Sequence, residues 1–588
     1  TRLANFTARI VRDVVRHEAG DIRRQVRIAA THADGTTAAT VVDASQYAAM
    51  GWVEDGLGPK FTVTAGKGHR DHVRAAIQFL SVRDGFDAET VHTSLGWVEH
   101  HGRPLYLHAG GCIARDGTCG DVRVEVDAAL GRYALPDPPG ARHDVAGAIT
   151  AVRGLLDLGQ AGRPAARHVA AILAALPWRA VLGPLDASVH FSGPTGTFKT
   201  TTALLALDHF APGSGAGRVS VTWGATPNAL QRHAYDCRDS LLVIDELTGE
   251  TAVETATEFF QCQGNLKARA RMTRDLRIAP GLDPRGTILS TGEANPGRRS
   301  ALGRMLTVRF TRETVDVATL SRCQQDAAAG RYTRAMAAYI RWLAEPGRLA
   351  ATRTELRRLV ERLADEVRAD PANRDVHPRH PAAVAELVAA YALFLRFAGE
   401  AGGVPQLTAD ASLATVRSGL IELMRDQAEA HRESDPACRF VALLKAGLSS
   451  ERFHLQDADS DNAPEPFAAV CGWHKDWLYQ GNDRGQMLDW RIPPNSRRVG
   501  YVDLKERVVY LDPELAKEVA RTMGRAAGQP FEHADNIARD LNEAKMLKTS
   551  VEAGKVRLTP HKRIRGVKDR YLTIWLDCLF GEAGGTGD

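Results

Sequence analysis

A glycine-rich turn is the feature that most constrains how this chain of 588 residues can fold. It spans Gly193–Thr201 and follows a short apolar run, Val189–Ser192, that is typical of a buried strand. The residues after it, Thr200–His209, have the pattern of a helix. The turn fits the phosphate-binding pattern G-x-x-x-x-G-K-[ST] at three of its four fixed positions. Strand, turn and helix in this order predict a parallel α/β sheet with a phosphate site at its edge.

The turn departs from the pattern at one position, where Phe198 stands in place of the glycine before the lysine. An additional glycine at 196 still lets the backbone turn tightly, so that its N–H groups converge on phosphate oxygens. We expect Lys199 to reach the β- and γ-phosphates and the Thr200 hydroxyl to ligate Mg²⁺. The alternative is an ordinary strand–turn–helix with a chance lysine. The expected ATP-binding residues are Gly193, Pro194, Thr195, Gly196, Thr197, Phe198, Lys199, Thr200 and Thr201.

A second motif supports the nucleotide interpretation. The apolar run Leu241–Ile244 is followed directly by two acids, Asp245 and Glu246. At the carboxyl end of a central strand, Asp245 is expected to hold Mg²⁺ and Glu246 to orient and polarise the attacking water. Taken alone, such a run often marks only the end of a strand. Combined with the glycine-rich turn, it predicts a hydrolase that uses ATP and Mg²⁺.

Two further segments complete the expected site. The strand candidate Gly286–Leu289 leads to Ser290 and Thr291, whose hydroxyls would contact the γ-phosphate or the water; plain strand-end polarity is the alternative. Arg304 is our first choice for an arginine that enters the site of a neighbouring subunit. Its competitors in this arginine-rich stretch are Arg298, Arg299 and Arg309. The expected catalytic residues are therefore Lys199, Glu246 and Arg304.

Basic residues are concentrated in two segments, although the net charge of the whole chain is only +4. The first segment lies between the two acids and the third strand and contains Lys267, Arg269, Arg271 and Arg274. The first three alternate with small residues, so on a strand they would project from one face. They are our candidates for phosphate contacts to single-stranded DNA, which would be independent of sequence. The alternative is a solvated or inter-subunit strand.

The second basic segment, residues 541–570, carries nine basic residues against three acidic ones. Lys562, Arg563 and Arg565 are its candidate DNA contacts. A helix over Asp535–Leu547, followed by strands at Lys555–Leu558 and Tyr571–Leu576, is the order of a winged helix, which commonly binds duplex DNA. A winged helix that serves protein contacts is the alternative.

Together these motifs resemble a helicase-like P-loop family catalogued as domain of unknown function nine-two-seven. The resemblance rests on Gly193–Thr201, Leu241–Glu246, Phe259–Arg271 and Ser290–Glu293, and on an upstream segment with Gly96, Trp97, Tyr106, Gly110 and Gly111. The order of motifs is also similar to superfamily 3 and AAA+ hexameric helicases. This implies a homo-oligomeric ring, a hexamer, with one DNA strand in its channel. Such proteins often accompany primase modules in phages, plasmids and integrative elements, so a primase is an implied partner.

We therefore expect an α/β multidomain chain. Its expected parts are a strand-rich collar domain (1–139), a helical linker (140–186), a P-loop NTPase core with a parallel sheet (187–317), a helical domain (318–455) and a winged-helix-like DNA-binding domain (467–588). Eight irregularly spaced cysteines and the lack of a long apolar run predict a cytoplasmic protein without a membrane partner.

The predicted function is an ATP-dependent, ring-forming DNA helicase or translocase that replicates a mobile element. One alternative is an NTP-dependent switch or scaffold, for example in phage defence, that hydrolyses ATP without unwinding DNA. Another is a DNA-binding initiator with a vestigial ATP site, which Phe198 would permit.

Overall fold

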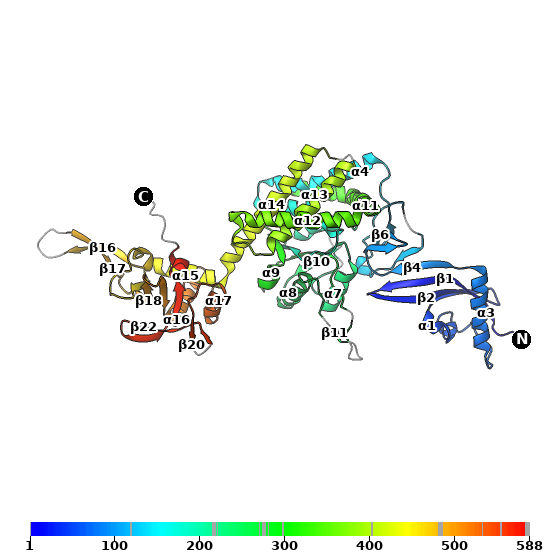
Figure 1. Cartoon of the computed structure of the whole chain (residues 1–588), viewed down its shortest axis with the longest axis horizontal. Coiled ribbons are helices and arrows are strands. Elements are labelled where there is room, and N and C mark those ends of the chain that lie inside the picture. Colours follow the sequence, from blue (N-terminus) through cyan, green and yellow to red (C-terminus); the bar gives the residue numbers. More distant parts are fainter. Residues whose placement is uncertain are drawn as a thin grey trace. The chain divides into compact units, whose positions relative to one another are not determined.

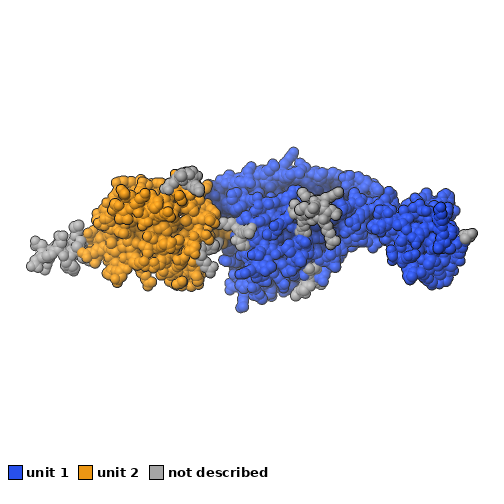
Figure 2. Space-filling model, turned by 90° about the horizontal axis from the view of Figure 1, so that it is seen from below, with its two compact units in different colours: residues 1–428 blue, residues 429–588 orange. Residues whose placement is uncertain are grey.

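A computed structural model of the chain describes residues 2–117, 120–213, 219, 221–269, 271–272, 278–279, 281–296, 299–401, 404–479, 486–531, 533–552 and 555–581. It contains two compact units, residues 1–428 and 429–588, which are coloured separately in Figure 2. The division falls within helix α14 (Gln406–Ser434), whereas the sequence suggested a helical domain that extends to residue 455. The finer domain boundaries stay predictions.

The amino-terminal part of unit 1 is a five-stranded sheet built on a long antiparallel hairpin, with the strand order β3-β2-β1-β4-β8. Its strands are β1 (Phe6–Glu18), β2 (Asp21–His32), β3 (Thr37–Asp43), β4 (Asp87–His92) and β8 (Val122–Val124). Helix α3 (His69–Asp84) buries Val73 and Ile77 in the core of this sheet. The short helices are α1 (Ala44–Tyr47) and α2 (Trp52–Asp55). A strand-rich amino-terminal part is therefore confirmed.

A small antiparallel sheet joins this part to the rest of unit 1. It consists of β5 (Gly96–His100), β6 (Arg103–His108) and β7 (Gly111–Ile113). The indole nitrogen of Trp97 donates to the carbonyl of Val181 at 2.8 Å, and the Tyr106 hydroxyl donates to the carbonyl of Asp239 at 2.8 Å. Both aromatic rings are buried in the large core of unit 1. The helices that follow are η1 (Ala128–Leu130), α4 (Arg142–Arg153), η2 (Gly154–Ala161) and α5 (Pro164–Ala180).

The central sheet of unit 1 is parallel, with the order β10-β13-β9-β14, which confirms the predicted parallel α/β core. Its strands are β9 (Ser188–Ser192), β10 (Leu241–Leu247), β13 (Thr287–Gly292) and β14 (Met305–Arg309). The intervening elements are α6 (Lys199–Leu207), α7 (Pro227–Asp236), α8 (Glu250–Gln263), the hairpin β11 (Arg271–Met272) and β12 (Ile278–Ala279), and α9 (Arg299–Leu302). Because β13 lies between β9 and β10, the end of β13 separates the glycine-rich turn from the two acids.

Five α-helices and the short 3₁₀-helix η3 (Pro371–Asn373) follow β14 in unit 1 among the described residues. Figure 1 shows α11, α12 and α13 grouped together above β10, with α7 and α8 below it. The five α-helices are α10 (Val317–Ala328), α11 (Arg331–Leu343), α12 (Arg348–Ala369), α13 (His380–Glu400) and α14. Helix α13 alone, among the described residues, is long and apolar enough to cross a membrane. However, 72% of its most apolar window is buried inside the protein, as in the core helix of a globular unit.

Unit 2 has a four-stranded sheet with the order β15-β18-β19-β24. Its strands are β15 (Phe453–Asp457), β18 (Arg497–Asp503), β19 (Val508–Leu511) and β24 (Leu572–Trp575). Its helices are α15 (Pro436–Ser449), η4 (Ala469–Cys471), α16 (Pro513–Ala526), η5 (His533–Asp535), α17 (Ile537–Glu543) and α18 (Leu576–Phe580). Its hairpins are β16/β17 (His474–Tyr479, Gln486–Arg491), β20/β21 (Ser550–Glu552, Lys555–Arg557) and β22/β23 (His561–Ile564, Val567–Arg570).

A winged helix in unit 2 is not confirmed. Helix α17 and the strands β21 and β24 follow one another in the expected order. However, β21 pairs with β20 and β24 pairs with β19, so the two strands expected to form the wing do not pair with each other. The sequence pattern identified the strands, but their partners come from parts of the chain that local patterns do not reveal.

Candidate nucleotide-binding site

The glycine-rich turn connects the carboxyl end of β9 to the amino end of α6. A Cβ on Gly193 would collide with the carbonyl oxygen of Phe310, so only glycine fits there. Gly196 has φ +80°, and Phe198, which precedes α6, has φ +65°. Both values lie in the left-handed region, which costs a residue with a Cβ about 1–2 kcal/mol. The backbone at Phe198 therefore keeps a conformation that suits glycine, although the side chain differs.

Lys199 is the first residue of α6 and is only 8% exposed. Its Nζ donates to the carbonyl of Pro194 at 2.7 Å, which holds the ammonium group against the glycine-rich turn. Burial lowers the pKa of Lys199, while Glu293 and Asp245 act in the opposite direction. A cation that is buried at a helix amino terminus, beside a turn rich in backbone N–H groups, suits a phosphate ligand.

The carboxylate of Asp245 accepts hydrogen bonds from hydroxyl groups on two other elements. The Thr200 Oγ1, on α6, donates to Asp245 Oδ1 at 3.0 Å. The Thr291 hydroxyl, at the end of β13, donates to the same carboxylate oxygen. Mg²⁺ prefers oxygen ligands, and in nucleotide sites it commonly binds one or two carboxylates together with a hydroxyl and phosphate oxygens. The oxygen atoms assembled at Asp245 therefore fit a magnesium ion.

A β-bulge positions the second acid. The pairing of β10 with β13 shifts register between Ile244 and Leu247, and Glu246 has φ +64°. Neighbouring side chains on a regular strand point to opposite faces, and a bulge interrupts this alternation. Glu246 is exposed, and its backbone N–H donates to Asp245 Oδ1 at 2.9 Å. The carboxylate of Glu246 is thus open to solvent at the edge of the sheet where Asp245 lies.

Ser290 and Thr291, which we predicted as equivalent contacts, have different surroundings. Ser290 is fully buried, and its Oγ accepts from Trp223 Nε1 at 2.9 Å and lies 3.0 Å from His190 Nδ1. Because His190 Nε2 lies 3.0 Å from the carbonyl of Ala294, the ring donates there and accepts from Ser290. Burial lowers the pKa of His190 to about 4, which is consistent with a neutral ring. Among the two hydroxyls, that of Thr291 reaches Asp245.

Sequence reasoning missed three residues of this site: His190, Trp223 and Glu293. Glu293 follows the end of β13, and its carboxylate accepts a hydrogen bond from the Thr195 hydroxyl in the glycine-rich turn. Its acidic side chain within the segment Ser290–Glu293 was the available signal. His190 and Trp223 gave no such signal, because a buried polar ring becomes informative only when its partners are known.

Arg304 lies away from this cluster. It precedes the amino end of β14, whereas the glycine-rich turn and Asp245 lie at carboxyl ends of parallel strands, so Arg304 is at the opposite edge of the sheet. Its guanidinium donates to the carbonyl of Ser300 and, at 2.9 Å, to Asn265 Oδ1. Arg304 cannot act on the site of its own chain in this arrangement. The side chains of Arg298 and Arg299 lie outside the described residues, and Arg309 is exposed at the other end of β14.

The basic segment before β13 does not have the expected form. Lys267 and Arg269 lie in irregular chain between α8 and β11, so the prediction that a strand projects them from one face is wrong. Each is paired with an acid: Lys267 with Asp283 at 2.8 Å and Arg269 with Glu258 at 2.7 Å. Their side chains remain 76% and 68% exposed. Arg274 and the side chain of Arg271 lie outside the described residues.

The three carboxyl-terminal candidates share one hairpin of unit 2, β22/β23. Lys562 pairs with Glu506 at 2.8 Å, and this hydrogen bond raises the pKa of Lys562. Arg565, in the turn with φ +52°, pairs with Asp461, while Arg563 is exposed on β22. The exposed face of this hairpin is basic, and two of the three cations are already partly neutralised by acids.

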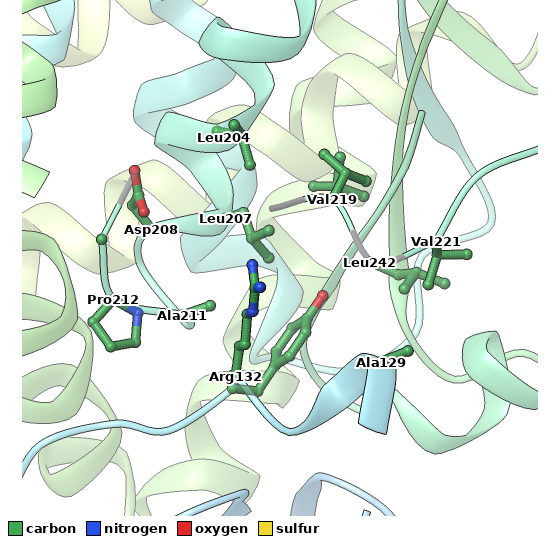
Figure 3. A pocket seen from close by; sticks show the side chains of 13 residues that line it. Ala129, Arg132, Leu204, Leu207, Asp208, Ala211, Pro212, Val219, Val221 and Leu242 are labelled. Carbon is green, nitrogen blue, oxygen red and sulfur yellow. The ribbon is translucent and has the colours of Figure 1, made fainter. Parts of the chain in front are cut away.

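A separate cavity lies at the other end of α6 and is lined by Leu204, Leu207 and Asp208. Figure 3 shows Leu204 and Leu207 on one side, with Val221 and Leu242 across from them. The volume of this cavity is about 20 Å³, which suits about one water molecule. It is therefore too small for a nucleotide, so the glycine-rich turn remains the candidate site.

Neither a protein-family model nor a curated protein matches the chain. Among solved structures, the chain is similar to one described as "SCCmec type IV Cch - active helicase". The TM-score is 0.52 at 12% sequence identity, and the match covers 98% of this chain and 94% of the other. At this identity the likeness shows a shared fold over nearly the full length of both chains, and nothing about activity. The resemblance to the family catalogued as domain of unknown function nine-two-seven stays a prediction.

Proposed function

We propose that the chain is an ATP-dependent helicase or translocase that acts on DNA. The observation that carries this proposal is the convergence of Thr200, Thr291 and Asp245 beside a glycine-rich turn that holds Lys199. The helicase-like fold over 98% of the chain supports the choice of a motor over other phosphate-binding proteins. The structural relative is described as an active helicase, and we propose that this chain acts in the replication of a mobile element.

In this proposal the phosphates of ATP lie on the backbone N–H groups of the turn, and Lys199 neutralises their charge. Thr200 and Asp245 would hold Mg²⁺, which would supply positive charge to the β- and γ-phosphates. Glu246 takes the proton of the attacking water, because its carboxylate is exposed beside Asp245. Thr291 orients this edge of the site through its hydrogen bond to Asp245.

A ring would follow from the position of Arg304. Since Arg304 lies at the opposite edge of its own sheet, it completes a nucleotide site only if that site belongs to a second copy of the chain. A head-to-tail interface of this kind closes into a ring when the rotation between copies closes. We propose a hexamer in which Lys267, Arg269, Arg271 and Arg274 contact a single strand, and in which the β22/β23 hairpin of unit 2 contacts duplex DNA.

The switch or scaffold function is the second candidate, and one observation favours it. Lys267 and Arg269, the described part of the expected single-strand contact, are each paired with an acid. Surface ion pairs of this kind are weak, so a DNA phosphate could replace the acid, but a permanent pair would leave no DNA contact.

DNA-stimulated ATP hydrolysis separates the two candidates. For the motor, the double variant Lys267→Glu, Arg269→Glu abolishes stimulation by DNA and keeps the basal rate. The matched control reverses two exposed arginines of α12, Arg358→Glu and Arg362→Glu, and keeps the stimulation. If the first double variant is stimulated like the unmodified protein, the motor proposal fails for this segment and the switch gains support.

A further inference from the structure

A groove lined by arginines lies at the amino-terminal edge of the central sheet, opposite the glycine-rich turn. It consists of two adjoining cavities of about 490 and 590 Å³, which share Arg238, Arg353 and Arg357. Arg238 lies just before β10, whereas Arg353 and Arg357 are one turn apart on α12. The first cavity is also lined by Arg179 and Arg285. Four segments far apart in sequence thus bring five guanidinium groups to one hollow.

Both carboxylates that line the first cavity already form ion pairs with arginines. Glu386 accepts a hydrogen bond from Arg179 Nε at 2.6 Å, so the charges of these two residues balance each other. Asp239 is contacted by Arg238 Nε at 3.2 Å and by Arg353 Nη2 at 3.3 Å. In the first cavity, two acids therefore face five arginines, and the second cavity adds one more acid, Glu99. The positive charge that remains is concentrated in a partly buried hollow, where water screens it less than at an open surface.

Two of these arginines have no carboxylate partner among the described residues. Arg285 donates its Nε to the carbonyl of Tyr235 at 2.8 Å and stacks 3.5 Å above the ring of the same tyrosine. Arg357 is exposed and makes a hydrogen bond of 3.3 Å to the Thr354 hydroxyl. Stacking and neutral hydrogen bonds fix these planar groups in place but do not balance their charge.

Burial disfavours the charged form of two of these arginines. Burial lowers the pKa of Arg285 to about 10 and also lowers the pKa of Arg353. Arg238 lowers the pKa of both further, while Asp239 acts in the opposite direction on both. Cations that are desolvated beside like charges gain from an anion with several oxygens, because phosphate accepts paired hydrogen bonds from guanidinium. An anion in the groove would therefore remove a repulsion that is built into the free protein.

We propose that this groove binds the phosphate backbone of a nucleic-acid strand. The proposal rests on the proposed function and adds a second contact surface in unit 1. Two joined cavities suit consecutive phosphates better than one compact ion. Trp97, which is the one aromatic residue among the described lining, is only 3% exposed, so no ring is available to stack a base. Contacts to the backbone without base stacking make binding independent of sequence.

Two neighbouring arginines of α12 give a matched test. Arg357 and Arg358 are both exposed on this helix, but only Arg357 lines the groove. The experiment measures fluorescence anisotropy of a labelled single-stranded oligonucleotide of mixed sequence, without ATP, over a range of salt concentrations. We expect Arg357→Glu to weaken binding about tenfold at low salt and to reduce the slope of log Kd against log salt by about 1. Arg358→Glu should change Kd by less than about twofold.

Equal weakening by both variants would overturn the proposal, because it would show a general charge effect. An unchanged Kd for Arg357→Glu would overturn it as well. A nucleotide as the true ligand is tested in the Lys199→Ala background with a labelled ATP analogue. If Arg357→Glu abolishes residual nucleotide binding there and leaves oligonucleotide binding intact, a nucleotide is the ligand and the strand assignment fails. Since these assays need no hydrolysis, their result is independent of the proposed ATPase activity.

Discussion

The Thr200 hydroxyl donates a hydrogen bond of 3.0 Å to Asp245 Oδ1, and this contact joins two residues 45 positions apart. It connects the first turn of α6, just after the glycine-rich turn, to the carboxyl end of β10. Thr291 reaches the same carboxylate oxygen from β13. Three elements of the central sheet region therefore meet at one carboxylate, and the proposed chemistry depends on it.

Replacement of Asp245 by asparagine tests the proposed magnesium site. Asp245→Asn keeps the size of the side chain and an oxygen that can accept from Thr200, but it removes the charge that Mg²⁺ needs. We expect ATP hydrolysis to fall by about 100-fold or more, measured as the steady-state rate against magnesium concentration. Asp283→Asn, which removes the acid paired with Lys267, is the control and should keep the basal rate. A rate for Asp245→Asn within about threefold of the unmodified protein would contradict the site.

Phe198 should carry backbone strain. Its φ of +65° suits glycine, and its side chain is 37% exposed, so Phe198→Gly relieves strain with little loss of packing. We expect the free energy of unfolding of unit 1 to rise by up to about 1 kcal/mol. Gly196→Ala, at φ +80°, should lower it by about 1–2 kcal/mol. Denaturant titration of both variants measures the difference, and a loss for Phe198→Gly as large as that for Gly196→Ala would show that the phenyl ring is needed.

Substitution of Ser290 should mainly lower stability, whereas substitution of Thr291 should mainly lower the rate of ATP hydrolysis. Ser290→Ala leaves the buried Trp223 indole N–H without its acceptor, which costs about 1–3 kcal/mol of unfolding free energy. Thr291→Val keeps the shape of the side chain but removes the hydrogen bond to Asp245, so the hydrolysis rate should fall more than stability. Thermal unfolding and steady-state hydrolysis, measured on both variants, test this division. The opposite pattern would assign the γ-phosphate contact to Ser290.

Acid should destabilise unit 1 partly through His190. Burial lowers its pKa from 6.5 to about 4 in the folded chain. Between these values the unfolded chain binds a proton and the folded chain does not, so this contribution to stability is complete above pH 6.5 and is lost as the pH falls toward 4. His190→Asn should make unfolding free energy less dependent on pH in this window. Denaturant titrations at pH 7 and pH 5 measure the slope, and an identical slope in the variant would exclude His190 as a source.

Local sequence patterns were sufficient to predict the strands and turns that a short run of residues defines. The apolar run before Asp245 became strand β10, and the turn at Gly193 became the connection from β9 to α6. Left-handed or crowded backbone positions explain why glycine stands at 193 and 196. These features could be predicted because hydrophobic period and glycine freedom act over a few residues.

Contacts over long sequence distances were not available to the same reasoning. The acids that pair with Lys267 and Arg269, Asp283 and Glu258, lie 16 and 11 positions away, so a basic run was mistaken for a free strand face. The different roles of Ser290 and Thr291 depend on Trp223, 67 positions from Ser290. The partners of β21 and β24 likewise depend on how distant segments pack.

Unwinding of a forked DNA duplex tests the central claim most directly. The assay follows release of a labelled strand with ATP and Mg²⁺, and it compares the unmodified protein with Lys199→Ala and with Lys445→Ala, a lysine of unit 2. We expect strand release by the unmodified protein and by Lys445→Ala, and none by Lys199→Ala, because Lys199 is the cation held at the glycine-rich turn. Equal release by Lys199→Ala, or ATP hydrolysis without strand release by the unmodified protein, would contradict the proposed helicase.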